Sequence, residues 1–106
     1  MVPLITDNTT NIILACDRHK LKYLYVFGSA ARETDFTGES DIDFLYAFDK
    51  ENIEFESYAD NYFEFRFRLE DLLKRNIDLV PEEQLTNPYL IQSINRDKIK
   101  IYGEGH

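Results

Sequence analysis

The amino-acid sequence predicts an α+β fold, in which helices pack against a small mixed sheet. Two short runs of apolar, aromatic and β-branched residues, Lys22 to Phe27 and Asp41 to Phe48, have the length and composition of buried strands. Helical patterns lie before the first run and after the second. At 106 residues the chain can build one hydrophobic core but not two. We therefore expect a single domain over residues 1–106.

Turn and capping residues separate the predicted elements of the first half of the chain. Asn8 and the threonines after it can cap a helix whose apolar positions include Ile12 and Cys16. Gly28 ends the first strand, and Gly38 lies in a polar stretch that is typical of a loop. The elements are, in order, a helix near residues 8–20, the strand Lys22 to Phe27, a helical turn from Ala30 to Arg32, a loop over residues 34–39, the strand Asp41 to Phe48 and a connection over residues 49–56.

The segment from Tyr58 to Lys74 fits two local structures. Phe63, Phe65 and Phe67 alternate with charged residues, which is a strand pattern. A helical stripe is sustained over more residues, however, so we predict a helix whose aromatic side chains pack in the core and do not form a platform for stacked bases. The stripe comprises Tyr58, Tyr62, Phe65, Leu69, Leu72 and Leu73.

The last third of the chain is predicted to add two short strands and a helix. The apolar stretch at Ile77 to Val80 ends at Pro81 and has strand character. We expect a helix near Pro88 to Asn95, a strand at Lys98 to Tyr102 and a frayed end over residues 103–106.

Composition restricts the location and the partners of the protein. Twenty acidic and twelve basic residues give a formal net charge of −8, which disfavours direct binding to the phosphate backbone of a nucleic acid. The sequence contains no apolar run long enough to span a bilayer and no recognisable signal peptide. The single cysteine, Cys16, is expected to be a buried small residue. These observations predict a cytoplasmic protein without direct nucleic-acid or membrane binding.

Gly28-Ser29, followed after eleven residues by Asp41-Ile42-Asp43, is the most informative motif. A glycine turn lets the backbone approach a phosphate closely. Side chains two apart in a strand share a face, about 7 Å apart, so both carboxylates can face one or two divalent cations while Ile42 points into the core. The motif therefore indicates a site for a metal-bound phosphate ester.

These segments resemble the signature of the minimal nucleotidyltransferases, which are small members of the DNA polymerase beta superfamily. The resemblance rests on Gly28-Ser29-Ala30-Ala31-Arg32 and on Ser40-Asp41-Ile42-Asp43-Phe44-Leu45. A third carboxylate of the family corresponds to Asp78, in the segment Arg75-Asn76-Ile77-Asp78-Leu79-Val80. This chain departs from the family where a glycine commonly follows the arginine, because Glu33 stands there and Gly38 comes later.

The resemblance implies a nucleotidyltransferase fold and a magnesium-dependent enzyme that uses ATP. It assigns two Mg²⁺ ions to Asp41, Asp43 and Asp78, with Asp78 either completing the metal site or acting as general base. It assigns nucleotide binding to Gly28, Ser29, Arg32 and Ser40. Arg32 has an alternative interpretation, as a surface residue paired with Glu33 or Asp35. No catalytic role is expected for His19 or His106.

The resemblance also implies an acceptor. Members of this family that are this small are often encoded beside a HEPN-family ribonuclease toxin and act as antitoxins, which transfer AMP from ATP to a tyrosine hydroxyl of that toxin in a complex of the two proteins. Two alternatives remain: a non-catalytic antitoxin that acts by occlusion, and an enzyme that modifies a small molecule such as an aminoglycoside. The intact set of glycine, serine and three aspartates favours catalysis over binding alone.

Overall fold

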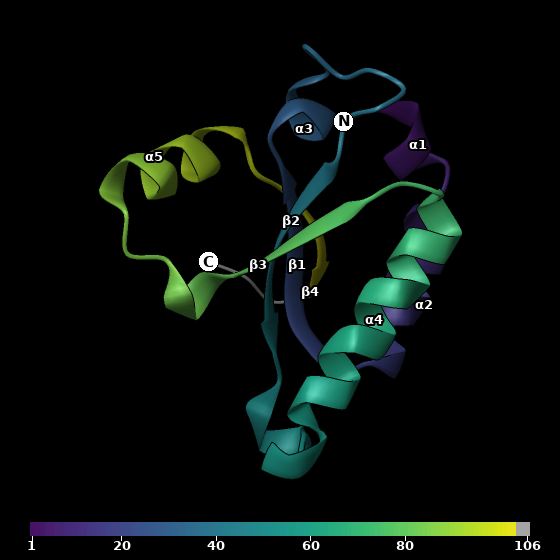
Figure 1. The fold of residues 1–106 in the computed structure, drawn as a ribbon, viewed down its shortest axis with the longest axis vertical. Helices are drawn as coiled ribbons and strands as arrows, with labels where there is room; N and C mark the ends of the chain where they lie inside the picture. Colours follow the sequence, from purple (N-terminus) through teal and green to yellow (C-terminus); the bar gives the residue numbers. More distant parts are fainter. Residues whose placement is uncertain (104–106) are drawn as a thin grey trace.

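A four-stranded mixed sheet organises the computed structural model, which describes residues 1–103 (Figure 1). The strand order is β3-β2-β1-β4; β1 is antiparallel to both β2 and β4, and β2 is parallel to β3. The strands are β1 (Leu21–Phe27), β2 (Ile42–Phe48), β3 (Ile77–Pro81) and β4 (Ile99–Gly103). The α+β class predicted from the sequence is confirmed.

Helices cover both faces of this sheet. Figure 1 shows α2 and α4 on one side and α5 on the other. The helices are α1 (Pro3–Thr6), α2 (Thr9–Arg18), α3 (Ser29–Arg32), α4 (Tyr58–Leu73) and α5 (Pro88–Asp97). Three short 3-10 helices lie in the connections, at Lys50–Asn52, Phe55–Ser57 and Glu82–Gln84.

Side-chain alternation along β2 separates the main core from a small apolar cluster on the other face of the sheet. Ile42 and Phe44 point to the face covered by α2 and α4, where they join the larger core with Phe65 and Leu69 of α4. Leu45 points to the opposite face, where it packs in the smaller cluster of Tyr23, Tyr25 and Ile94. Asp43 has the same parity as Leu45, so its side chain lies on the α5 face.

The sequence predicts most elements to within about two residues. The exceptions lie at the ends, where Pro3–Thr6 forms an additional helix and Gly103 is the last residue of β4 rather than part of a frayed end. The N-terminal cap of α2 also differs from the prediction. The Asn8 side chain makes no capping hydrogen bond to α2 and instead donates to the Leu4 carbonyl at 2.8 Å. The rest of the predicted frayed end lies outside the described residues.

The ambiguous segment forms α4, as the longer helical stripe predicts. Phe65 and Leu69 are fully buried. Phe63 and Phe67 lie on the outer side, 49% and 62% exposed, with their rings stacked 6.3 Å apart. The expectation that the aromatic residues of this segment all pack in the core is therefore wrong for these two residues, because the helical period directs them to solvent.

The buried Cys16 and His19 both lie at the junction of α2 with the larger core. Cys16 is fully buried, as expected, and burial raises the pKa of its thiol to about 12. His19 is only 5% exposed and its ring lies 5.7 Å from that of Phe65; burial lowers its pKa. No helix among residues 1–103 is both long enough and apolar enough to cross a membrane.

Glu33 occupies a backbone position that favours glycine. It ends α3 with φ 65° and ψ 15°, the left-handed conformation that side chains with a Cβ disfavour by about 1 kcal/mol. This is the place where the resembled family commonly has glycine. The Glu33 side chain accepts from the N-terminal ammonium of Met1 at 3.1 Å, so a local contact accompanies the unfavourable backbone.

Replacing Glu33 separates these two effects. Glu33→Gly and Glu33→Ala both remove the contact with Met1, but only glycine relieves the backbone. We expect Glu33→Gly to be more stable than Glu33→Ala by about 1 kcal/mol in urea-induced unfolding. Equal stabilities of the two variants would show that the left-handed backbone at this position costs nothing.

Candidate active site

At one end of the sheet, β1 ends where β2 and β3 begin. The antiparallel pairing of β1 and β2 places Phe27 beside Asp43, and the parallel pairing of β2 and β3 places Asp43 beside Asp78. Gly28 follows Phe27 directly. Because paired residues of neighbouring strands point to the same face, the turn after β1 and the carboxylates of Asp43 and Asp78 form one row across the sheet, which we call the carboxylate row.

Gly28 lies against the carboxylate of Asp43. Its φ of 70° lies in the range that L side chains rarely adopt, and a Cβ built on it would be 2.6 Å from Asp43 Oδ2. The Gly28 carbonyl accepts hydrogen bonds from the backbone N–H groups of Ala31 and Arg32 at 3.0 Å, which begins the α3 turn. The backbone conformation therefore favours glycine here, and a Cβ would also displace the Asp43 carboxylate.

The environment of Asp43 disfavours its negative charge. Burial, together with the negative charges of Asp78 and Asp41, raises the pKa of this carboxyl from 3.8 to about 6, while Arg32 partly offsets these effects. Asp41 is exposed and lies just before β2, and Asp78 is exposed on β3. A half-buried carboxylate repelled by two others is the environment in which a cation is most favourable.

The donor set fits magnesium that arrives with a substrate. Within the described residues, no group of three or more His, Cys, Asp or Glu side chains is arranged to hold a metal ion by itself. Mg²⁺, however, is usually bound by one or two carboxylates together with waters and substrate phosphates. The carboxylates of Asp41, Asp43 and Asp78 therefore suit an ion whose remaining ligands come from a triphosphate.

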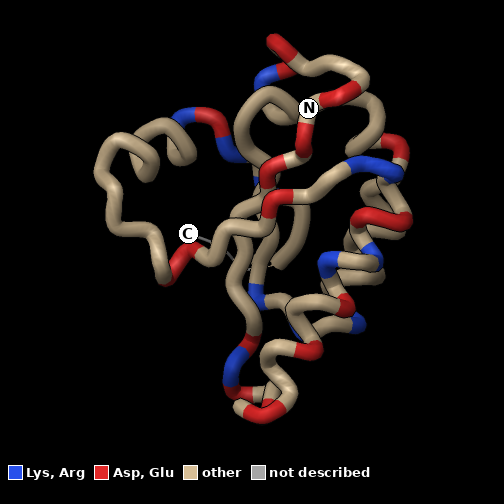
Figure 2. Tube along the Cα trace, in the orientation of Figure 1, with Lys and Arg blue, Asp and Glu red and all other residues tan. Residues whose placement is uncertain are grey.

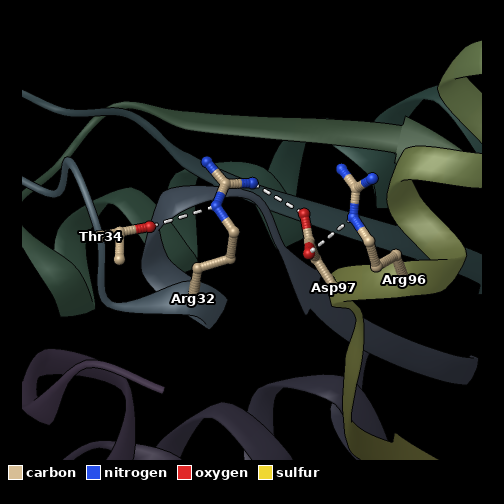
Figure 3. Close-up of polar contacts among 4 residues, drawn as sticks. All are labelled: Arg32, Thr34, Arg96 and Asp97. Carbon is tan, nitrogen blue, oxygen red and sulfur yellow. Dashed lines mark hydrogen bonds and ion pairs between the residues drawn. The ribbon is translucent and has the colours of Figure 1, made fainter.

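Arg32 reaches across the site to α5 (Figure 3). Its Nη1 donates to Asp97 Oδ2 at 2.7 Å and its Nε to Thr34 Oγ1 at 3.3 Å. The Asp97 side chain is only 8% exposed and also lies 3.6 Å from Nε of Arg96. The acidic partner of Arg32 is therefore Asp97 and not Glu33 or Asp35. Local sequence contains no signal for this pair, because its members are 65 residues apart.

Ser40 belongs to the loop that leads to Asp41. Its Oγ accepts from the Thr37 backbone N–H at 2.9 Å and lies 3.2 Å from Thr37 Oγ1. Arg75 donates to the carbonyls of Thr37, at 2.6 Å, and of Ser40, and its guanidinium lies 4.7 Å from the centre of the Phe36 ring. Arg75 thus fixes the loop that positions Asp41, a role that its position before β3 does not reveal in the sequence.

The raised pKa of Asp43 has a consequence for stability. The folded protein holds this proton more tightly than the unfolded chain, so stability falls as pH rises from about 4 to about 6 and stays lower above that range. Asp43→Asn should therefore be more stable than the parent at pH 7.5. A pKa raised from 3.8 to about 6 corresponds to about 3 kcal/mol, and partial exposure of the carboxyl reduces this to about 1–2 kcal/mol.

Urea unfolding at pH 7.5 and at pH 4, without divalent ions, measures this gain. The difference between Asp43→Asn and the parent should shrink at pH 4, where the parent carboxyl is protonated. Asp71→Asn is the control and should change stability little, because Asp71 is exposed near the end of α4 and its ion pair with Lys74 lies at the surface. A destabilised Asp43→Asn at pH 7.5 would contradict the repulsion.

Known proteins with similar sequences have related names. Two proteins of Methanocaldococcus jannaschii, each named "Putative protein adenylyltransferase", are 38% identical to this chain over 85 residues. Each match covers 80% of this chain and 81% of the relative. The similarity therefore extends over most of both proteins.

Solved structures share the fold. A structure described as a "putative minimal nucleotidyltransferase" matches with a TM-score of 0.72 and 29% identity, covering 92% of this chain and 95% of that chain. A chain of a toxin-antitoxin structure with AMP-PNP matches with a TM-score of 0.67 and 23% identity, covering 92% of this chain and 74% of that chain. A chain in the structure of a tri-AMPylated HEPN toxin of Shewanella oneidensis with MNT antitoxin matches with a TM-score of 0.62 and 21% identity. The match covers 93% of this chain and 72% of that chain. The last two show the fold alone.

The family model of the nucleotidyltransferase domain matches residues 12–101, from within α2 to within β4. The matched range contains the Gly28-Ser29 turn, both aspartates of the Asp41-Ile42-Asp43 motif and Asp78. The resemblance inferred from these segments is therefore confirmed, and the chain belongs to the nucleotidyltransferase domain family.

Proposed function

We propose that this protein transfers AMP from ATP to a tyrosine hydroxyl of a partner protein, a HEPN-family toxin, and acts as its antitoxin. The carboxylate row is the observation on which the proposal mainly rests, because it joins a glycine turn to a carboxylate whose pKa is raised to about 6. Family membership and the name of the M. jannaschii relatives support adenylyl transfer to a protein. The solved toxin-antitoxin relatives support the choice of partner and of nucleotide.

The carboxylate row and the residues beside it have separate proposed tasks. The backbone at Gly28 and the hydroxyl of Ser29 contact the β and γ phosphates, where the absence of a Cβ allows close approach. Asp41 and Asp43 would hold the magnesium that accompanies the triphosphate. When bound, magnesium supplies positive charge that stabilises the charge developing on the phosphate oxygens.

The reaction exchanges one phosphorus–oxygen bond for another. The acceptor oxygen forms a bond to the α phosphorus, the bond to the β-phosphate oxygen breaks, and pyrophosphate leaves. A tyrosine hydroxyl has a pKa near 10, so its proton must be removed as it attacks. Asp78, beside Asp43 at the exposed edge of the row, accepts that proton.

The surface charge favours a protein acceptor over a nucleic acid. The formal net charge is −8, and Figure 2 shows acidic residues distributed over helices, loops and the end of the sheet at which β2 and β3 begin. The phosphodiester backbone of a nucleic acid would be repelled by such a surface, whereas a protein can present complementary basic groups. A single nucleotide differs from a nucleic acid, because its charge is partly neutralised by magnesium.

Replacing Asp41 and Asp43 together tests the transfer. With the purified toxin, ATP and Mg²⁺, the parent should add one or more AMP masses to the toxin, as measured by intact mass spectrometry. Asp41→Asn with Asp43→Asn should reduce the rate by about 100-fold or more, because the site loses the charges that hold the cation. Asp60→Asn with Asp71→Asn changes the charge equally at exposed positions of α4 and should retain the parental rate. If the double variant still neutralises the toxin and the mass of the toxin does not change, the protein acts by occlusion and not by AMP transfer.

Asp78→Asn tests the proposed base. A general base acts in the transition state, so the single-turnover rate should fall by about 100-fold while the dissociation constant for ATP with Mg²⁺ changes less than about threefold. Isothermal titration calorimetry measures the affinity, and quenched-flow with labelled ATP measures the rate. If the affinity falls as much as the rate, Asp78 instead contributes to binding the metal and its nucleotide.

A further inference from the structure

A long uncharged run of the sequence forms α5 and the turn before it. Residues 84–95 contain no Asp, Glu, Lys or Arg, although 30% of the residues of the chain are charged. Residues 23–31 form another uncharged run, but none of them is exposed, whereas most of residues 84–95 are exposed. Figure 2 shows this uncharged segment between acidic residues at one end and basic residues at the other. Contact with solvent does not account for such a composition, because a surface helix normally carries charged side chains on its outer side.

The apolar side of α5 extends beyond the cover that the sheet provides. Ile94 is 2% exposed and packs with Tyr25 and Leu45. Leu90 lies one turn before Ile94 on the same side of the helix, yet it is 43% exposed. The neighbouring Tyr89 is 82% exposed. The first turn of α5 therefore presents two large hydrophobic side chains to solvent.

A helix cap fixes the backbone beneath these two side chains. The side chain of Asn87 accepts hydrogen bonds from the backbone N–H groups of Tyr89, at 2.9 Å, and of Leu90, at 3.2 Å. At the other end of α5, the ion pair of Asp97 with Arg32 holds the helix to α3. Binding residues whose backbone is already ordered lose less conformational entropy when a partner docks. The first turn of α5 is therefore preorganised for an interface.

The composition and the position of this turn point to a protein partner. The centres of protein interfaces are poor in charged residues and rich in aromatic ones, and Tyr is frequent among the residues that dominate affinity. Helix α5 lies on the face of the sheet to which Asp43 points (Figure 1). Tyr89 is eight residues before Asp97, so it lies about 12 Å from it along the helix axis. A protein that docks on Tyr89 and Leu90 therefore lies close to the carboxylate row.

The charges around the uncharged run favour a different protein over a second copy of this chain. Glu82 and Glu83 precede the run and Arg96 follows it. A complementary partner presents a basic group at the first end and an acidic group at the second. A second copy carries the same formal net charge of −8, and the repulsion between two such copies opposes their association.

We propose that residues 84–95, which we term the α5 surface, form the docking site for the protein that accepts AMP, with Tyr89 and Leu90 as the anchors. The partner packs an uncharged, apolar patch on these two side chains. The proposal rests on the proposed function, because it takes the acceptor to be a protein, and it adds where that protein is held. Docking and chemistry are then tasks of neighbouring parts of the same face.

Two matched double variants test the α5 surface. Tyr89→Ala with Leu90→Ala, the anchor variant, removes both side chains. Phe55→Ala with Leu14→Ala makes the same kinds of change before α4 and on α2, where Phe55 is 92% and Leu14 61% exposed. Circular dichroism melts compare the folding of both with that of the parent, and Tyr89→Ala alone replaces the anchor variant if that variant folds poorly.

Binding and chemistry are measured separately. Isothermal titration calorimetry gives dissociation constants for the purified HEPN toxin and for ATP with Mg²⁺, and quenched-flow at saturating toxin gives the rate of AMP transfer. The anchor variant should bind the toxin about 10-fold or more weakly, because a few anchor residues carry most of the affinity of an interface. Its affinity for ATP and its transfer rate at saturating toxin should stay within about twofold of the parent. The control variant should match the parent in all three measurements.

The possible failures are distinguishable. Unchanged affinity of the anchor variant for the toxin would overturn the α5 surface while leaving AMP transfer intact. If light scattering shows that the parent alone is a dimer and the anchor variant a monomer, the α5 surface holds a second copy and the proposal is wrong. If the parent binds the toxin through the anchors but adds no AMP to it, the α5 surface stands and the proposed transfer is wrong. If the parent neither binds nor modifies the toxin, both are wrong.

Discussion

The pairing of β2 with β1 on one side and with β3 on the other is the constraint on which the rest of the structure depends. Backbone hydrogen bonds fix its register against β1 and β3 at the same time, so that Phe27, Asp43 and Asp78 lie side by side. A shift of one residue would turn Asp43 into the larger core and Phe44 out of it. The register that buries the apolar residues of β2 on one face of the sheet therefore also positions Asp43 on the other face. The larger core and the candidate site depend on the same strand register.

The sequence predicts the elements of the sheet well because their signals are local. Strand composition, the Gly28 turn and the helical stripe of α4 each lie within a short window, and each element forms where expected. The helix Pro3–Thr6 was missed because its four residues give no periodic signal; its stability depends on contacts such as the hydrogen bond from the Val2 N–H to the Ala30 carbonyl. The exposure of Phe63 and Phe67 follows from the helical period, but apolar composition alone suggested burial.

The candidate site was predicted where a short motif contains the chemistry and missed where contacts are distant in sequence. Gly28 and the aspartates are recognisable from residue type and spacing. Asp97 and Arg75 are not, because their partners, Arg32 and the carbonyls of Thr37 and Ser40, are 35 or more residues away. The repulsion at Asp43 likewise depends on Asp78, which only the parallel pairing of β2 and β3 brings beside it.

The burial of Cys16 makes its thiol unreactive toward thiol reagents in the folded protein. Oxidants and alkylating agents react with the thiolate, and burial raises the pKa of this thiol to about 12, so almost none is ionised at neutral pH. Cys16 is the only cysteine of the chain. Its side chain becomes reactive only when α2 separates from the sheet, so one native residue can report on that opening. A cysteine introduced at the surface can equally be labelled without a competing reaction from the interior.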